Sequence, residues 1–101
     1  MSTQLSEFSA NTVISATQGQ LSSELDGESV ILHLDSGIYY GLNEVGARIW
    51  ALVQQPCSFS NLQRTLLEEY QVSEADCIQA VVNILRDLKR AGLIEVRDEK
   101  V

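Results

Sequence analysis

The segment that most constrains this chain is Gly37-Ile38-Tyr39-Tyr40-Gly41-Leu42-Asn43, in which a short strand leads directly into a helix. The β-branched and aromatic side chains of residues 38–42 favour an extended conformation. Asn43 is a preferred N-cap, and Glu44 follows in the first turn, where a negative charge interacts favourably with the helix dipole. The segment therefore divides the chain into a strand-forming part before Asn43 and a helical part after it.

The residues before this segment predict two further strands. Residues 20–25 alternate between apolar and polar side chains, and Asp26-Gly27 has the preference for positive φ that a two-residue type I′ turn requires. Residues 29–34 form the next predicted strand, and residues 35–37 form a second turn before the strand at 38–42. The sequence thus predicts a three-stranded antiparallel meander with strands of ordinary length.

Side-chain alternation assigns the two faces of the second strand. We expect Val30, Leu32 and Leu34 on its core face and His33 on the opposite face. The sequence ties no Ser or Cys nucleophile to His33 and contains no glycine-rich phosphate loop. We therefore predict no catalytic residue and no enzymatic activity.

The third strand places its two adjacent tyrosines on opposite faces. We expect Ile38, Tyr40 and Leu42 on the buried face and Tyr39 on the outer face. Two interpretations of Tyr39 stay open at this point. It is either a good strand former on a half-exposed surface or a residue that contacts a ligand strand.

Three helices are predicted after Asn43. An apolar stripe marks the first helix, which Pro56 ends. The second helix begins after Ser58 or Ser60. Ser73 caps the third helix, and Gly92 follows its end. The apolar residues of the third helix cover an arc wider than one buried face requires; they are Cys77, Ile78, Ala80, Val81, Val82, Ile84, Leu85, Leu88 and Ala91.

Composition excludes several classes of function. The 101 residues include seven Lys and Arg against fourteen Asp and Glu, for a net charge of -7, which disfavours a phosphate-binding surface and hence nucleic acid. No apolar run is long enough to span a membrane, and no signal peptide opens the chain, so we expect a cytoplasmic protein. Cys57 and Cys77 lack metal-ligand spacing, and we predict neither a metal nor a cofactor.

The composition predicts a single domain with short irregular ends. Residues 1–12 are polar and without periodicity, and we expect them to be flexible. Residues 13–96 form the expected domain. Residues 97–101 include four charged side chains, and we expect them to form a flexible end.

The last strand of the meander has the properties of an open sheet edge. Proteins usually protect such an edge with Lys, Pro or a bulge, and residues 38–42 contain none of these. If the third helix lies beside this strand, backbone groups and aliphatic side chains form the two walls of a groove. An extended peptide could bind there by β-augmentation.

Two stretches resemble a known family. They are residues 34–50, Leu-Asp-Ser-Gly-Ile-Tyr-Tyr-Gly-Leu-Asn-Glu-Val-Gly-Ala-Arg-Ile-Trp, and residues 84–94, Ile-Leu-Arg-Asp-Leu-Lys-Arg-Ala-Gly-Leu-Ile. Both resemble the PqqD family, the recognition elements that bind precursor peptides in ribosomal peptide natural-product pathways. The resemblance covers residues 20–96, nearly the whole domain.

This resemblance implies an α+β fold of the winged helix-turn-helix type, with a three-stranded antiparallel sheet followed by three helices. It also implies that the leader of a precursor peptide adds antiparallel to the third strand, against the third helix. A stand-alone chain of this size looks most like the lasso-peptide version, which presents the precursor to a leader protease. The enzyme served could equally be a radical S-adenosylmethionine enzyme or another modifying enzyme.

Carrying the family groove onto this chain gives a set of peptide-binding residues. On the third helix, the flank with Cys77, Ala80, Ile84 and Ala91 competes with the flank formed by Ile78, Val82 and Lys89. We favour the first flank because its small residues leave room for inserted side chains. The predicted peptide-binding residues are Ile38, Tyr39, Tyr40, Gly41, Leu42, Cys77, Ala80, Val81, Ile84 and Leu88.

Two other classes of function stay open from the sequence. Three helices beside a small sheet are also the arrangement of a winged-helix DNA-binding regulator, although the acidic charge counts against that class. A structural subunit could instead use the open edge to pair with a partner, or with a second copy as a homodimer.

Overall fold

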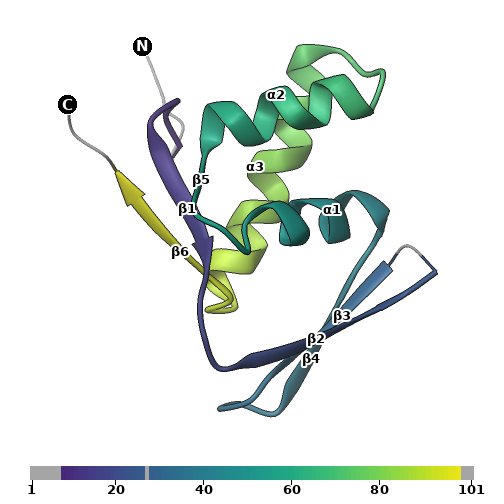
Figure 1. Ribbon diagram of the computed structural model, residues 1–101, viewed down its shortest axis with the longest axis vertical. Helices are drawn as coiled ribbons and strands as arrows, with labels where there is room; N and C mark the ends of the chain where they lie inside the picture. Colours follow the sequence, from purple (N-terminus) through teal and green to yellow (C-terminus); the bar gives the residue numbers. More distant parts are fainter. Residues whose placement is uncertain (1–7, 27, 99–101) are drawn as a thin grey trace.

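The computed structural model describes residues 8–26 and 28–98, which fold into two small antiparallel sheets and three helices (Figure 1). One sheet has the order β5-β1-β6 and the other the order β2-β3-β4. The α+β class expected from the sequence is confirmed, with the meander followed by three helices. The elements in chain order are β1 Thr12–Ala16, β2 Gln20–Leu25, β3 Glu28–His33, β4 Ile38–Leu42, α1 Glu44–Leu52, β5 Cys57–Ser58, α2 Phe59–Glu69, α3 Glu74–Arg90 and β6 Ile94–Asp98.

The meander predicted from the sequence is β2, β3 and β4. Leu25 pairs with Glu28 across the first turn, and His33 pairs with Ile38 across the second. Asp26 has a φ of 54°, as expected for the two-residue turn, while its neighbour Gly27 lies outside the described residues. The turn chemistry read from the sequence therefore sets the register of the first hairpin.

The predicted faces of β3 are wrong. Ile31 is completely buried, whereas Val30 is 41% exposed and Leu34 is 50% exposed. Residues 29–34 carry apolar side chains on both faces, so alternation alone does not specify which face is buried. Packing decides it, because Ile31 pairs with Tyr40 on the face that α1 covers. His33, which alternates with Ile31, consequently faces the same side and not the outer side.

The helix boundaries follow the predicted caps. The side chains of Asn43, Ser58 and Ser73 each accept a hydrogen bond from a backbone N–H in the first turn of the helix that follows. The second helix therefore starts after Ser58 and not after Ser60. At the end of α3, Gly92 has a φ of 77°, the left-handed conformation that glycine adopts most readily.

The second sheet was not predicted. β1 joins residues far away in sequence, from the pair Thr12–Asp98 to the pair Ala16–Ile94, and a short stretch of β5 pairs on its other side. The hydroxyl of Thr12 donates to the Asp98 carboxylate at 2.8 Å. The folded domain thus includes residues before 13 and after 96, beyond both bounds of the expected domain.

The segment before β1 also reaches the core. Phe8 is 4% exposed, and its ring stacks on Phe59 with the centroids 5.7 Å apart. Of the residues 1–12 that were expected to be flexible, residues 8–12 therefore pack against the rest of the protein, and residues 1–7 lie outside the described residues. The core that Phe8 joins lies among the three helices, with Ile49, Leu62 and Leu85 completely buried.

We predict that Phe8→Ala lowers the free energy of unfolding by about 3 kcal/mol, because it removes a large buried side chain and leaves a cavity. Urea denaturation monitored by circular dichroism measures the change. Leu21→Ala is the matched control, since Leu21 is 60% exposed and should alter stability by less than about 0.5 kcal/mol. Equal stability of Phe8→Ala and the unchanged protein would contradict the packing of the N-terminal segment.

Candidate functional site

The candidate site lies along one edge of the meander. β4 pairs only with β3, and within residues 8–26 and 28–98 no other strand pairs with its second side. That side presents backbone donors and acceptors along an extended segment without Lys or Pro. It is the edge at which a strand from another polypeptide could add.

Helix α3 forms the opposite wall of a groove beside this edge. A cavity of about 560 Å³ lies between β4 and the C-terminal part of α3. Leu88 and Ala91 contribute the apolar part of the helix wall. The residues that line this cavity are Tyr39, Tyr40, Gly41, Leu42, Asp87, Leu88, Arg90, Ala91 and Leu93.

A second, smaller cavity of about 250 Å³ lies beside the N-terminal half of α3. It is almost entirely apolar and is lined by side chains from all three helices and from the segment between α2 and α3. Among its lining residues Ala80 is exposed, while Cys77 and Val81 are buried. Its lining residues are Val45, Leu66, Tyr70, Val72, Asp76, Cys77, Ala80 and Val81.

The predicted site residues divide between these two cavities. On the strand, residues 39–42 line the larger cavity, while Ile38 is 50% exposed and lines neither. On the helix, Leu88 lines the larger cavity, and Cys77, Ala80 and Val81 line the smaller one. Ile84 lies between them along α3 and packs partly against the core. The Cys77-to-Ala91 flank of α3 is thus the one that lies along the cavities.

Sequence reasoning missed the charged residues of the larger cavity. Neither Asp87 nor Arg90 is among the predicted peptide-binding residues, yet both line the cavity. Their spacing contained the information, because residues three and four apart share a helix face. Asp87 lies three residues after Ile84 and four before Ala91, and Arg90 lies three residues after Asp87. The Arg90 and Asp87 side chains approach to 3.9 Å and are about four-fifths exposed, so their attraction is weak.

A stronger ion pair joins α1 to α2 near the smaller cavity. Arg48 donates from Nε and Nη2 to both Glu69 carboxylate oxygens, at 2.6 to 3.1 Å. These hydrogen bonds lower the pKa of Glu69 and raise the pKa of Arg48. The pair fixes the two helices next to Tyr70, which lines that cavity.

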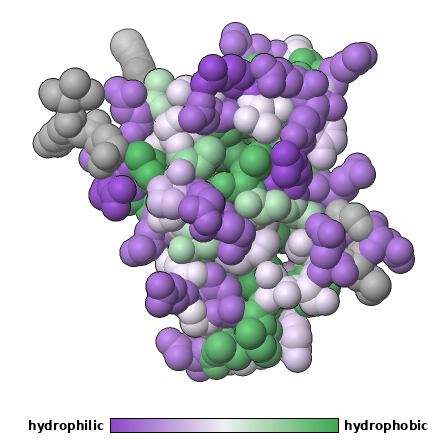
Figure 2. Space-filling model, in the orientation of Figure 1, coloured by the Kyte–Doolittle hydropathy of each residue, from purple (hydrophilic) through white to green (hydrophobic). Residues whose placement is uncertain are grey.

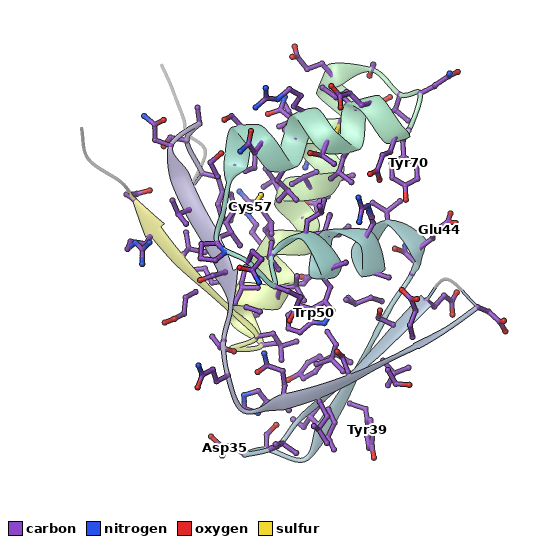
Figure 3. The ribbon with its side chains drawn as sticks, in the orientation of Figure 1. Asp35, Tyr39, Glu44, Trp50, Cys57 and Tyr70 are labelled. Carbon is purple, nitrogen blue, oxygen red and sulfur yellow. The ribbon has the colours of Figure 1, made fainter. Side chains whose placement is uncertain are left out.

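The two faces of β4 differ as the sequence predicted for Tyr39, Tyr40 and Leu42. Tyr40 and Leu42 pack against the core, and Tyr39 is 69% exposed. Figure 3 shows Tyr39 pointing away from the helices, on the other side of the sheet from Trp50 of α1. Ile38 is the exception, since at the start of β4 half of it is exposed. In Figure 2 hydrophobic side chains show on the surface at the end of the molecule where β3 turns into β4.

β4 and α3 run in opposite directions. The Leu42 end of β4 leads into α1, whose Val45 lines the smaller cavity with the first turns of α3. At the other end, His33 pairs with Ile38 and its Nε2 lies close to Gly92, just after α3. An antiparallel partner of β4 would therefore run parallel to α3.

Other kinds of site find no support in the described part of the chain. No three His, Cys, Asp or Glu side chains there come together as a metal site. None of the helices in residues 8–26 and 28–98 has the length and apolar character needed to cross a bilayer.

The family model described as coenzyme PQQ synthesis protein D (PqqD) matches residues 28–94, about two thirds of the chain. This chain belongs to the PqqD family. The match begins at β3 and ends at the start of β6, so it contains both walls of the groove. The comparison with curated proteins gives no match.

Two solved structures resemble this PqqD-family chain over most of its length. TbiB1 in complex with the TbiA(beta) leader peptide is 31% identical, with a TM-score of 0.74 over 80% of this chain and 94% of TbiB1. A lasso peptide synthetase B1 complexed with the leader peptide is 23% identical, with a TM-score of 0.71 over 81% of this chain and 96% of that one. The second likeness shows the shared fold.

Burial raises the pKa of both thiols of this PqqD-family chain, and nearby Glu74 adds to the rise at Cys77. Because the thiolate is the reactive form, we predict slow alkylation of Cys57 and Cys77 by iodoacetamide at about pH 8. The rate should climb only at a pH above the ordinary thiol range. Mass spectrometry at a series of pH values measures it, with the protein in concentrated guanidinium chloride as the reference. Equal rates in the folded and unfolded protein would contradict the burial of the two thiols.

Proposed function

We propose that this chain is a non-catalytic adaptor that binds the leader of a ribosomally made precursor peptide. The leader adds as a strand to the free edge of β4 and packs against α3. The adaptor then presents the precursor to a leader protease, a radical S-adenosylmethionine enzyme or another modifying enzyme. It would act in the cytoplasm, where ribosomes release the precursor, and we assign it no cofactor.

One observation carries this proposal. The unpaired edge of β4 faces the Leu88 and Ala91 side of α3 across a cavity of about 560 Å³. An extended peptide in that position satisfies its own backbone groups and those of β4, and it removes apolar surface from water. A few backbone hydrogen bonds with two or three apolar anchors can supply about -8 to -12 kcal/mol, the range of micromolar to nanomolar affinity.

The comparison with TbiB1 supports the same function. TbiB1 was solved with a leader peptide, is 31% identical to this chain and is matched over nearly its whole length. The PqqD-family match extends over both β4 and α3, so the shared region contains the proposed groove. We infer that this chain also takes a leader peptide as its ligand.

An antiparallel leader would enter the groove with a defined direction. It would run parallel to α3, so its N-terminal part would lie near the smaller cavity and its C-terminal part near Arg90. Binding would order a flexible segment and hold the rest of the precursor near the enzyme at a raised effective concentration. This is how a protein without catalytic groups can accelerate a reaction on the precursor.

We predict that Ile84→Asp weakens leader binding at least tenfold, about 1.4 kcal/mol or more, because it places a carboxylate on the helix wall between the two cavities. Fluorescence anisotropy with a labelled synthetic leader peptide from the cognate precursor measures the affinity. Thermal denaturation confirms that the variant is folded.

Ile78→Asp is the matched control. Ile78 carries the same side chain on the same helix but lies on the other flank and is 36% exposed. Its substitution should leave the affinity within about twofold. If Ile84→Asp is folded and binds the leader as tightly as the unchanged protein, or if only Ile78→Asp loses affinity, this side of α3 does not bind the leader.

A further inference from the structure

Gly41 occupies a position where the fold itself does not require glycine. Its φ is not in the positive region, and a Cβ built on it would meet no atom within 4 Å. The pairing of β3 with β4 is regular from Ser29–Leu42 to His33–Ile38, so no bulge explains the residue either. Glycine weakens the interior of a strand, and where no bulge or turn requires it, it often marks a site of close approach by another chain or ligand.

The missing side chain of Gly41 would point to the outer face of the meander. Gly41 pairs with Val30, which pairs with Ser23, and these three residues form one row across the sheet. Because cross-strand partners share a face, this row lies on the side opposite the Ile31 and Tyr40 row that packs under α1. The outer face is therefore the solvent-facing side of the proposed peptide-binding edge.

The outer face of the meander is unusually apolar around Gly41. Tyr39 is 69% exposed, and Val30 is 41% exposed. Tyr39 pairs with Leu32 and through it with Leu21, so a second row of large side chains runs beside the Gly41 row. Among the described residues seven large hydrophobic side chains are exposed, and four of them belong to this face of the meander and its turn: Leu21, Val30, Leu34 and Tyr39. Such a concentration is typical of an interaction surface.

A strand added to β4 would place one of its residues directly beside Gly41. Neighbouring strands lie about 4.8 Å apart, so that residue would be about 10 Å from Val30, with only the glycine backbone between them. A small side chain on the added strand could not reach Val30 over this distance. An aromatic ring could lie over Gly41 and contact Val30, with the edge of the ring beside Tyr39. Pairing an aromatic residue with a glycine on a neighbouring strand is a known way to repair the weakness of that glycine.

We propose that Gly41 is a specificity position, and that the leader residue paired with it carries a large aromatic side chain lying across Gly41 on the outer face. This inference rests on the proposed function, because it assumes that the leader adds to β4. It goes further because it predicts that the protein contacts side chains on both faces of the bound leader strand. The inner face meets α3, and the outer face meets the rows of Gly41 and Tyr39.

A specificity switch tests this inference. A phage-displayed library of random peptides is selected on the unchanged protein, on Gly41→Val and on the control Ser23→Val. Ser23 is exposed in the same outer row but belongs to β2, the other edge of the sheet. We expect peptides selected on the unchanged protein to share an aromatic residue at one position. Gly41→Val should select Gly, Ala or Ser there while keeping the rest of the motif, and Ser23→Val should select the original motif.

Synthetic peptides then give the size of the effect. Replacing the aromatic residue by Ala should weaken binding to the unchanged protein by roughly three- to tenfold, the upper range for a cross-strand pair with added burial. On Gly41→Val the Ala peptide should bind better than the aromatic one. Gly41→Val should also keep or raise the melting temperature, since the site is open and valine favours a strand.

Two outcomes would overturn the inference alone. One is that Gly41→Val selects the same aromatic residue as the unchanged protein, and the other is that its melting temperature falls by more than a few degrees. If the proposed function itself is wrong, the same experiments give a different result. In that case no peptide is enriched on any of the proteins, or the enriched peptides bind Ile84→Asp as tightly as the unchanged protein.

Discussion

The site depends on the junction at which β4 becomes α1. The Asn43 side chain accepts a hydrogen bond from the Gly46 backbone N–H at 2.9 Å, and Asn43 alone separates the end of the strand from the start of the helix. A Cβ on Gly46 would lie 3.3 Å from the Leu42 Cβ and 3.4 Å from Asn43 Oδ1, which shows how tightly the chain turns there. This turn holds α1 over the inner face of the meander and leaves the far edge of β4 beside α3. The groove is a consequence of that geometry.

Much of the local structure could be predicted because local chemistry determines it. The caps at Asn43, Ser58 and Ser73, the turn at Asp26 and the left-handed Gly92 all act within a few residues of sequence. The faces of β3 could not be predicted in this way, because apolar residues occupy both sides and tertiary packing makes the choice. The sheet formed by β1, β5 and β6 was missed because its pairs, such as Thr12 with Asp98, join the two ends of the chain.

The candidate site was predicted more completely on the strand than on the helix. A strand without Lys, Pro or a bulge is visible in the sequence as an open edge, and Tyr39 to Leu42 do line the larger cavity. To predict the helix wall of the groove, the direction in which α3 crosses the sheet must be known, and no residue pattern gives that direction. The sequence therefore identified the apolar Leu88 but not its charged neighbours Asp87 and Arg90.

The most direct measurement of the central claim is amide hydrogen exchange, resolved by residue, with and without the leader peptide. β2 and β4 are both outer strands of the same sheet, so β2 serves as an internal reference. If the leader completes the sheet at β4, alternate amides in Ile38–Leu42 that do not bond to β3 should exchange at least about tenfold more slowly with peptide, while β2 is unchanged. Unchanged exchange along β4 at saturating leader, or protection at β2 in its place, would contradict strand addition at this edge.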